Sequence, residues 1–233
     1  MKFQIISDLY LKEGEKWTFP ILSENLILAG NISNPYEGVF WDFLKFVSRS
    51  FKKVIFIPGN YEFQQYSINI VEKFLMETFR IFPNIYYLNN NWLIIDNIAI
   101  FGSILLSKIS KNIKHCIDVS EKINDLTIKG RNLYFKACCN TLKTGINFHH
   151  SMDKKIIVVT HYSPIVNDSE YNGTNLHFFM DIKKVDYFIH GHTNHNYPEN
   201  ILNTEYGTYI SNQRGKNDVE FLDNFNPNFI LEI

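Results

Sequence analysis

The sequence has little cysteine and no long apolar run. Its 233 residues include three cysteines, Cys116, Cys138 and Cys139, and the last two are adjacent. Such a set fits neither a disulfide framework nor a CxxC metal site, so we expect reduced thiols in an intracellular, cytoplasmic protein. The N-terminus lacks the pattern of a signal peptide and no run of about 18 apolar residues occurs, so we expect no membrane association.

Neither sign of charge is in excess. The chain has 23 Lys and Arg against 24 Asp and Glu, which gives a formal net charge of -1. This balance provides no net field that would attract nucleic acid or an anionic membrane, and nothing in it indicates a nucleic-acid partner.

Apolar side chains, by contrast, are abundant. Hydrophobic residues make up 45% and aromatic residues 15% of the chain, which is enough for a sizeable core and argues against disorder. The length suits one large domain or two small ones. Because the sequence has no linker, internal repeat or low-complexity segment, we predict a single domain over residues 1–233.

Short apolar runs rich in Ile, Val and Phe alternate with helical patterns. Runs of this length favour buried strands over helices. The runs that end in small or polar residues are Lys2–Ser7, Asn25–Ala29, Lys53–Pro58, Lys155–Thr160 and Asp186–Ile189. Further strands are predicted at Ile85–Leu88, Leu93–Ile95, Ile98–Phe101, Thr208–Ser211 and Phe229–Ile233, with a tight hairpin turn at Asp96-Asn97.

Three segments have apolar residues at helical spacing, which predicts amphipathic helices. They are Tyr36–Phe51, Ser67–Arg80 and Asn132–Phe148. The buried faces are expected to hold, respectively, Phe40, Phe43, Leu44 and Val47; Ile70, Phe74 and Phe79; and Leu133, Ala137, Leu142 and Ile146. Strands that alternate with helices and also include a hairpin predict an α/β fold of mixed topology.

Five side chains with metal-binding chemistry come just after predicted strands. They are Asp8, Asn31, Asn60, His161 and His192. Taken singly, each is better explained as a cap, a turn residue or a core histidine, but the five together, all at strand ends, favour a shared site. Because side chains at the carboxyl ends of strands converge on one crevice of an α/β sheet, we expect these five to share a cleft. Oxygen and imidazole donors of this kind suit Zn, Mn or Fe.

The segments around these residues resemble, in order, the five motifs of calcineurin-like metallophosphoesterases, a superfamily that includes bacterial-type Ser/Thr phosphatases. The family writes the motifs as SDxH, GD, GNHE, THHxP and GHTH. The corresponding segments are Ile6-Ser7-Asp8-Leu9-Tyr10, Leu28-Ala29-Gly30-Asn31, Pro58-Gly59-Asn60-Tyr61-Glu62, Thr160-His161-Tyr162-Ser163-Pro164 and His190-Gly191-His192-Thr193-Asn194. The resemblance implies an α/β fold of four layers, in which two mixed β-sheets are flanked by helices.

The sequence departs from the family at the positions that carry the chemistry. The resemblance implies a first metal on Asp8 and on the positions of Tyr10, Asn31 and Asn194, where the family has His, Asp and His. It implies a second metal on the position of Asn31, which bridges both ions, together with Asn60, His161 and His192. Tyr61 stands at the family's catalytic His, and Arg214 lies in a segment similar to the NPRG turn, which suggests a phosphate contact.

These departures predict a weakened metal site. A neutral Asn31 amide cannot cancel the repulsion between two divalent cations as a bridging carboxylate does. A tyrosine hydroxyl with a pKa of about 10 is a poor metal ligand at neutral pH. We therefore expect no cofactor, or a single Mn, Zn or Fe ion near Asn60, His161 and His192. His195 is a poor substitute for the lost ligand, since neighbouring side chains of an extended chain point in opposite directions.

Three functions remain open. The first is a non-catalytic binding or scaffold protein with a protein partner, for which an apolar patch at Phe178, Phe179 and Met180 is a candidate contact, although a buried helical turn explains those residues equally well. The second is a residual one-metal phosphoesterase on a small phosphate ester or nucleotide. The third is a sensor that binds phosphate or a nucleotide through Arg214, Tyr61 and the remaining histidines without cleaving it.

Overall fold

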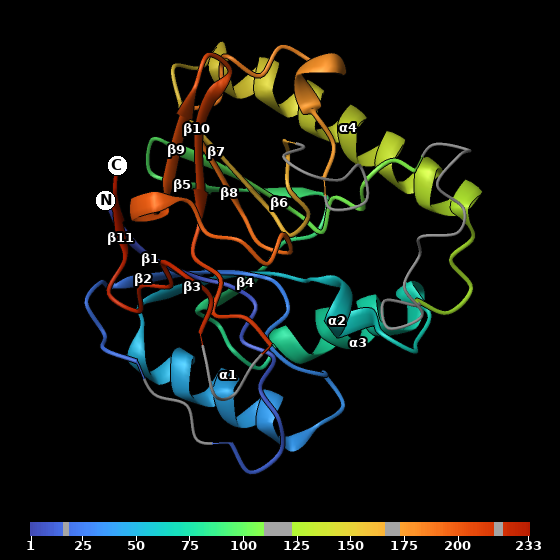
Figure 1. Cartoon of the computed structure of the whole chain (residues 1–233), viewed down its shortest axis with the longest axis vertical. Helices are drawn as coiled ribbons and strands as arrows, with labels where there is room; N and C mark the ends of the chain where they lie inside the picture. The colour runs from blue at the N-terminus through green and yellow to red at the C-terminus, as the bar shows by residue number, and fades with distance from the viewer. Residues whose placement is uncertain (16–18, 110–122, 166–172, 217–220) are drawn as a thin grey trace.

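Two β-sheets stacked face to face and covered by helices on both outer sides form the molecule (Figure 1). The computed structural model describes residues 1–15, 19–109, 123–165, 173–216 and 221–233. In order along the chain, the strands and helices are β1 (Lys2–Ile6), β2 (Asn25–Ala29), α1 (Gly38–Ser50), β3 (Lys53–Ile57), α2 (Asn60–Phe63), α3 (Ile68–Phe79), β4 (Ile85–Tyr87), β5 (Asn91–Ile95), β6 (Ile98–Ser103), α4 (Ile128–His150), β7 (Lys155–Thr160), β8 (Tyr187–His190), β9 (Ile201–Thr204), β10 (Gly207–Ser211) and β11 (Ile230–Glu232). Two short 3-10 helices, η3 (Leu176–Phe178) and η4 (Pro198–Asn200), complete the described elements.

Both sheets are mixed. The first has the strand order β11-β1-β2-β3-β4, in which β1 to β4 are parallel and β11 is antiparallel to β1. The second has the order β5-β6-β7-β8-β10-β9, in which the central strands are parallel and the edge strands β5 and β9 are antiparallel to their neighbours. The parallel strands β1, β2, β3, β7 and β8 therefore all send their carboxyl ends, and the loops that follow them, to the same end of the sandwich.

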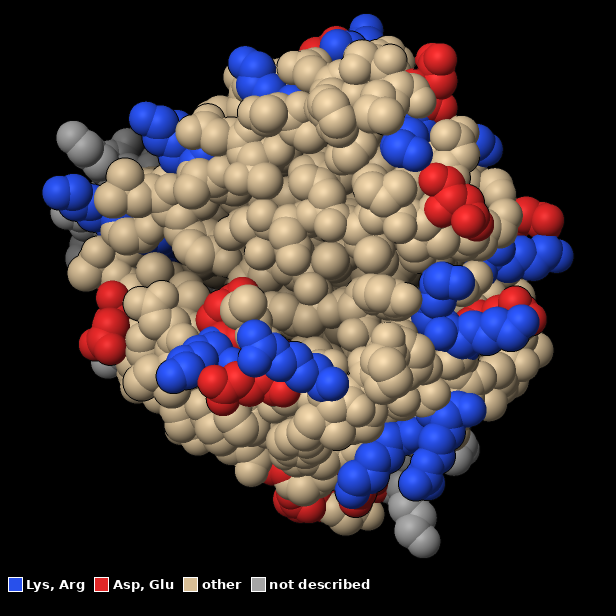
Figure 2. All heavy atoms as spheres, turned by 180° about the vertical axis from the view of Figure 1, so that it is seen from behind, with Lys and Arg blue, Asp and Glu red and all other residues tan. Residues whose placement is uncertain are grey.

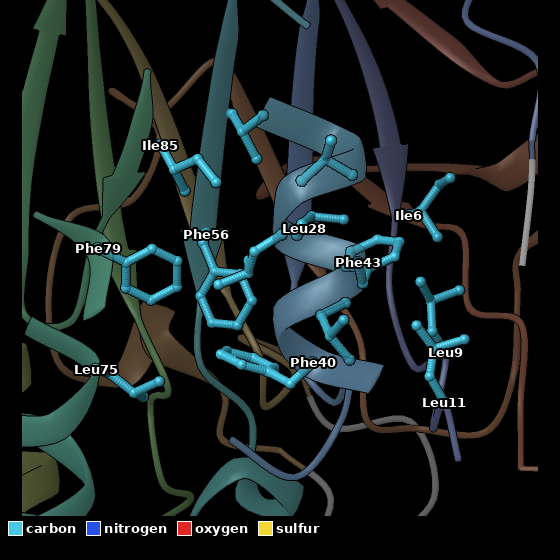
Figure 3. Close-up of a cluster of buried hydrophobic side chains, with 14 of the residues drawn as sticks. Ile6, Leu9, Leu11, Leu28, Phe40, Phe43, Phe56, Leu75, Phe79 and Ile85 are labelled. Carbon is cyan, nitrogen blue, oxygen red and sulfur yellow. The ribbon is translucent and has the colours of Figure 1, made fainter. Parts of the chain in front are cut away.

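Alternating side chains bury both faces of each sheet. In β3, Val54 and Phe56 point to the layer of α1 and α3, whereas Ile55 and Ile57 point to the opposite sheet. Such an unbroken apolar run is typical of a parallel strand that is covered on both faces. Figure 3 shows the first of these layers, in which Phe40 from α1 packs against Phe56 and Phe79. A third core lies between the second sheet and α4, so the layers number four.

The predicted strands and helices all occur, but the expected buried faces of α3 and α4 are only partly right. Phe79, Leu142 and Ile146 are buried as expected. Ile70 and Leu133 are instead 62% and 58% exposed, and Ala137 is exposed as well. In α3 the buried side chains are Val71, Leu75, Thr78 and Phe79, and in α4 they include Phe135, Cys138, Cys139, Leu142, Gly145, Ile146 and His149. Both helices carry apolar residues on more than one face, so periodicity alone did not select the face that meets the sheet. The short elements α2 and β9 were missed.

The cysteines behave as buried core residues. Cys138 and Cys139 are free thiols of α4, and burial raises the pKa of each thiol to about 12. Cys116 lies outside the described residues. Of the helices that the structure describes, none combines the length and the apolar character needed to cross a membrane.

Replacement of Phe56 by Ala tests the core beneath the first sheet. Phe56 is fully buried and its ring centroid lies 4.9 Å from that of Phe79. We expect Phe56→Ala to lower the free energy of unfolding by about 3–5 kcal/mol, measured by urea denaturation, because it removes apolar contacts and leaves a cavity. Phe178→Ala is the matched control, since Phe178 is 75% exposed, and should change stability by less than about 0.5 kcal/mol. Equal losses in the two variants would contradict this view of the core.

Candidate functional site

Five loops at one end of the sandwich bring the predicted site residues together. Asp8, Asn31 and His192 follow β1, β2 and β8 and have φ angles of 56°, 56° and 69°. Asn, Asp and His are the residues other than glycine that adopt left-handed backbone most readily, so all three positions tolerate these angles. Asn60, which was considered as a left-handed turn residue, instead begins the helical turn α2. All five predicted side chains lie at least nine-tenths buried in one cluster.

The side-chain amide of Asn31 is the centre of this cluster. Its Nδ2 atom lies 3.0 Å from Oδ1 of Asp8, 2.7 Å from the hydroxyl of Tyr10 and 3.4 Å from Oδ1 of Asn60. Its Oδ1 atom accepts the backbone N–H of Tyr61 at 2.8 Å, which fixes the orientation of the amide. The N–H donors of Asn31 therefore point at the oxygens on which a cation would otherwise sit.

Protein donors satisfy the Asp8 carboxylate. Oδ1 accepts from Asn31 Nδ2 and from the hydroxyl of Tyr10, at 3.0 and 3.3 Å. Oδ2 accepts the backbone N–H of His192 at 3.1 Å. This contact depends on Gly191, where a Cβ atom would lie 2.4 Å from Oδ2 of Asp8. A buried carboxylate requires such donors, and here the protein supplies three of them.

The two histidines meet the other side of the cluster at Asn60. Nε2 of His161 and Nδ1 of His192 lie 2.9 and 3.1 Å from Oδ1 of Asn60. Nδ1 of His161 lies 2.9 Å from the carbonyl oxygen of Ala29, which can only accept, so this nitrogen carries a proton. Burial lowers the pKa of His192 well below its ordinary value, and nearby His161 and Arg131 lower it further. His192 is therefore a neutral imidazole at neutral pH.

The tautomer of His161 leaves no hydrogen atom between its Nε2 and Oδ1 of Asn60. With Nδ1 protonated, a neutral His161 turns the lone pair of Nε2 toward Oδ1 of Asn60. Two acceptors then face each other at 2.9 Å. A second proton on His161 or a cation between the two atoms would resolve the contact. Rotation of the Asn60 amide would also resolve it, but it would turn one NH2 group toward that of Asn31.

Glu62 holds the loops of the cluster in place, and sequence analysis gave it no role. Its carboxylate is fully buried and accepts four backbone N–H groups, from Asn31, Ile32, Ser33 and Gly59. Burial raises the pKa of Glu62, and the hydrogen bonds from the backbone partly oppose that shift. A glutamate inside an otherwise apolar and amide-rich turn was the signal in the sequence, since a buried carboxylate needs donors.

Tyr10 and Tyr61 close the cluster on its outer side. Their rings meet edge to face with centroids 5.1 Å apart, and Nζ of Lys216 lies 5.2 Å from the centroid of the Tyr10 ring. Burial is the main cause that raises the pKa of Tyr61, with further contributions from Glu37 and Glu62. The phenol of Tyr61 is therefore protonated at neutral pH.

The remaining predicted positions lie away from the centre. Asn194 and His195 are exposed, and the backbone N–H of Asn194 donates to Oε1 of Gln213. Arg214 is buried, its Nη1 lies 2.8 Å from Oε1 of Glu15, and its guanidinium lies over the ring of Phe221, so in this structure it pairs with a carboxylate. His190 is a core residue that bonds the hydroxyl of Tyr197 at 2.9 Å, and burial lowers its pKa to about 4.

The donor set can be compared with what divalent metal ions need. Within the described ranges, no group of three or more His, Cys, Asp and Glu side chains is placed to hold a metal ion. The half of the cluster around Asp8 does not fit a cation, since the N–H groups of Asn31 face the same oxygens. The half around Asn60, His161 and His192 brings together one amide oxygen and two imidazole nitrogens, which lie 2.9 and 3.1 Å from that oxygen and are donors of the kinds that Zn, Mn and Fe accept.

Comparison with known proteins places this geometry in context. The family model described as Calcineurin-like phosphoesterase matches residues 5–196. An uncharacterized protein of Acanthamoeba polyphaga mimivirus is 28% identical over 165 residues, which is 62% of this chain and 56% of the viral protein. The match thus spans little more than half of that relative.

Solved structures support the fold. One aligns with a TM-score of 0.53 at 11% identity over 91% of this chain and 90% of its own. A Staphylococcus aureus protein assigned as a 5′-nucleotidase aligns with a TM-score of 0.50 at 13% identity, over 90% of this chain and 48% of its own. At these low sequence identities, the structural similarity supports the fold alone.

Replacement of Asn31 by Asp tests the role of the amide. In the presence of EDTA, Asn31→Asp should lower the free energy of unfolding by at least about 1–3 kcal/mol, because Asp8 loses a donor and gains a neighbouring carboxylate. Thermal and urea unfolding followed by circular dichroism would measure the change. Asn194→Asp is the control, since Asn194 is exposed, and should be close to neutral. If Asn31→Asp is as stable as the original chain without metal, the amide is not the centre of the cluster.

Proposed function

The chain belongs to the calcineurin-like phosphoesterase family, and on that premise we propose that it uses the family fold for binding rather than for two-metal hydrolysis. One observation carries the proposal: the Asp8 carboxylate is satisfied by Asn31, Tyr10 and a backbone N–H. Two of those three donors come from residues that replace metal ligands of the family pattern. The substitutions therefore act together, since they supply the donors that a metal ion would make unnecessary.

Hydrolysis by two metals needs charge that this cluster does not provide. A pair of cations requires a bridging anion and an activated hydroxide between them. Asn31 is neutral, and its Nδ2 would direct positive N–H dipoles at the ions. A metal pair would therefore have to expel or rotate the amide and break the contacts to Asp8, Tyr10 and Tyr61.

The side chains on the outer side of the cluster suggest which class of ligand such a protein would bind. Tyr61 is half-buried and lies against the buried ring of Tyr10, over which Lys216 places a cation. Aromatic rings next to a lysine suit a phosphate ester or nucleotide, in which a base can stack and a phosphate can pair with the ammonium. We infer that a ligand of this class, bound without cleavage, is the first to test; Arg214 would join it only if its pair with Glu15 opens.

A residual one-metal phosphoesterase is the second candidate. It is favoured by the contact between Nε2 of His161 and Oδ1 of Asn60, where two acceptors face each other at 2.9 Å. A single divalent ion held there by Asn60, His161 and His192 would resolve this contact and would supply a Lewis acid. None of these three side chains carries a negative charge, so the ion would be bound weakly.

Manganese titration of the original chain and of a restored variant separates these functions. The variant combines Tyr10→His, Asn31→Asp, Tyr61→His and Asn194→His. We expect the original chain to hydrolyse bis(4-nitrophenyl) phosphate no faster than buffer and to take up at most one ion. The restored variant should bind two ions in isothermal titration, because the bridging anion returns. A triple variant that keeps Asn31 is the control and should fail to bind the pair.

Two results would contradict the binding proposal. Two ordered cations in the original chain would show that an amide can bridge them. Turnover of the ester by the original chain, abolished by EDTA, would favour the one-metal enzyme instead. A restored variant that folds but remains metal-free would mean that the cluster has changed beyond its ligands.

Titration with added zinc tests the one-metal candidate separately. If that candidate holds, the original chain should bind about one equivalent of zinc in isothermal titration, and His161→Ala should lower the affinity by about 10-fold or more, since an imidazole ligand is lost. His195→Ala is the control, because His195 is exposed. Equal zinc affinity in both variants would rule out the predicted site.

A further inference from the structure

Strand β5 forms an open edge of the second sheet. Among the described strands, it pairs only with β6, in the register Asn91↔Gly102 to Ile95↔Ile98. The pair Ile95↔Ile98 closes a two-residue turn and is therefore a hydrogen-bonded pair, as are Leu93 and Asn91 with their partners. Trp92 and Ile94 alternate with them, so their backbone N–H and C=O groups face away from the sheet.

This edge lacks the features with which proteins protect open strands. Natural edge strands usually carry charges, proline or a bulge, which prevent further pairing. β5 reads Asn-Trp-Leu-Ile-Ile, and residues 81–95 contain no Lys, Arg, Asp or Glu. By comparison, the edge strand β11 has Glu232 paired with Lys2 at 3.3 Å, and β9 lies between Glu199 and Glu205.

The surface beside β5 is also apolar. Ile94 is 44% exposed and Phe148, at the end of α4, is 58% exposed. Trp92 and Phe148 line a shallow hollow of about 550 Å³ between β5 and α4. β5 lies at the opposite edge of its sheet from β9, on the side seen in Figure 2, where the middle of the face carries very few charged side chains.

We propose that β5 pairs with β5 of a second copy of this chain, antiparallel about a twofold axis at Leu93. In this register Trp92 lies opposite Ile94 of the other copy, and the reverse pair forms by symmetry. The outward N–H and C=O groups of both residues then exchange hydrogen bonds. The second sheets of the two copies then form one continuous sheet, and β5 of each copy no longer has an unpaired edge.

A second copy fits this edge better than an unrelated strand would. The outward groups of β5 belong to two residues that are placed symmetrically about Leu93, so the strand is complementary to itself. Trp92 meets Ile94 on the outer face, an aromatic–β-branched pair that stabilises antiparallel strands. Because residues 81–95 carry no charge, the twofold axis brings no like charges together.

Sedimentation velocity over about 1 to 100 µM tests the proposal, since two short strands with their apolar neighbours indicate a dissociation constant on the order of micromolar. The original chain should shift from monomer to dimer across this range. Ile94→Lys should remain monomeric, with association at least about 10-fold weaker, because it places two lysines at the interface. Ile201→Lys on β9 is the matched control, at 37% exposure, and should still dimerise.

A cysteine variant tests the register and does not depend on loss of binding. Leu93 faces Leu93 of the other copy as a pair without hydrogen bonds, with Cα atoms about 4.5 Å apart, which permits a disulfide. In a Cys116→Ser background, Leu93→Cys should form a covalent dimer on mild oxidation, seen on a non-reducing gel. Leu202→Cys on β9 is the control and should remain a monomer. Cys138 and Cys139 should not interfere, since the pKa of each thiol is about 12.

Each other outcome overturns the proposal. An original chain that remains monomeric over the whole range excludes the dimer. A dimer that Ile201→Lys disrupts as strongly as Ile94→Lys does would place the interface elsewhere. A dimer in which Leu93→Cys does not cross-link would exclude this register. Heteromeric complexes that form only with another protein would mean that β5 binds a foreign strand.

Discussion

The cluster depends on one buried carboxylate. Glu62 accepts four backbone N–H groups, three from the loop after β2 and one from the loop after β3. The two loops are therefore tied together independently of the side chains that fill the space between them. A carboxylate that is fully buried and fully bonded is difficult to replace, since any neutral substitute leaves donors unsatisfied. This explains how the two loops stay together although several ligand positions differ from the family pattern.

With the loops fixed, the chemistry at the centre depends on the groups that Asp8 meets. A carboxylate in this position requires positive partners, and metal ions or N–H and O–H donors can provide them. Here the amide of Asn31 and the hydroxyl of Tyr10 do so. The same substitutions that remove metal ligands thus supply hydrogen-bond donors, and the cluster is satisfied on this side. On the side of His161, two hydrogen-bond acceptors face each other. A single cation between them is therefore compatible with this side of the cluster.

The sheets impose a different constraint at the edge of the molecule. The apolar layer between them requires strands that are buried on both faces, and the central parallel strands meet this requirement. An edge strand has no second neighbour, so its sequence decides whether it remains alone. β5 keeps the apolar character of a central strand although it stands at an edge. That mismatch between sequence and position gives the edge its capacity for pairing.

The sequence by itself determined the fold class, the strands and the group of residues that meet at the strand ends. Apolar runs of strand length and motifs placed after them are local patterns, and the chain order of five motifs is highly specific. Where local patterns were ambiguous, the sequence failed: Ile70 and Leu133 lie on apolar faces of their helices but point to solvent. Sequence analysis also gave no role to His149, which is buried and whose Nδ1 has no hydrogen-bond partner among the described residues.

Only the tertiary structure decided what the substitutions mean. The sequence showed that Asn31 and Tyr10 replace metal ligands, which indicates a loss. It could not show that the amide of one bonds the hydroxyl of the other and that both bond Asp8, because hydrogen bonds between residues distant in sequence depend on loop geometry. The hydrogen bonds that Glu62 accepts could not be predicted for the same reason, since its partners are backbone groups that have no sequence signature. The sequence shows which chemical groups the side chains carry, whereas the fold determines which partners form hydrogen bonds with them.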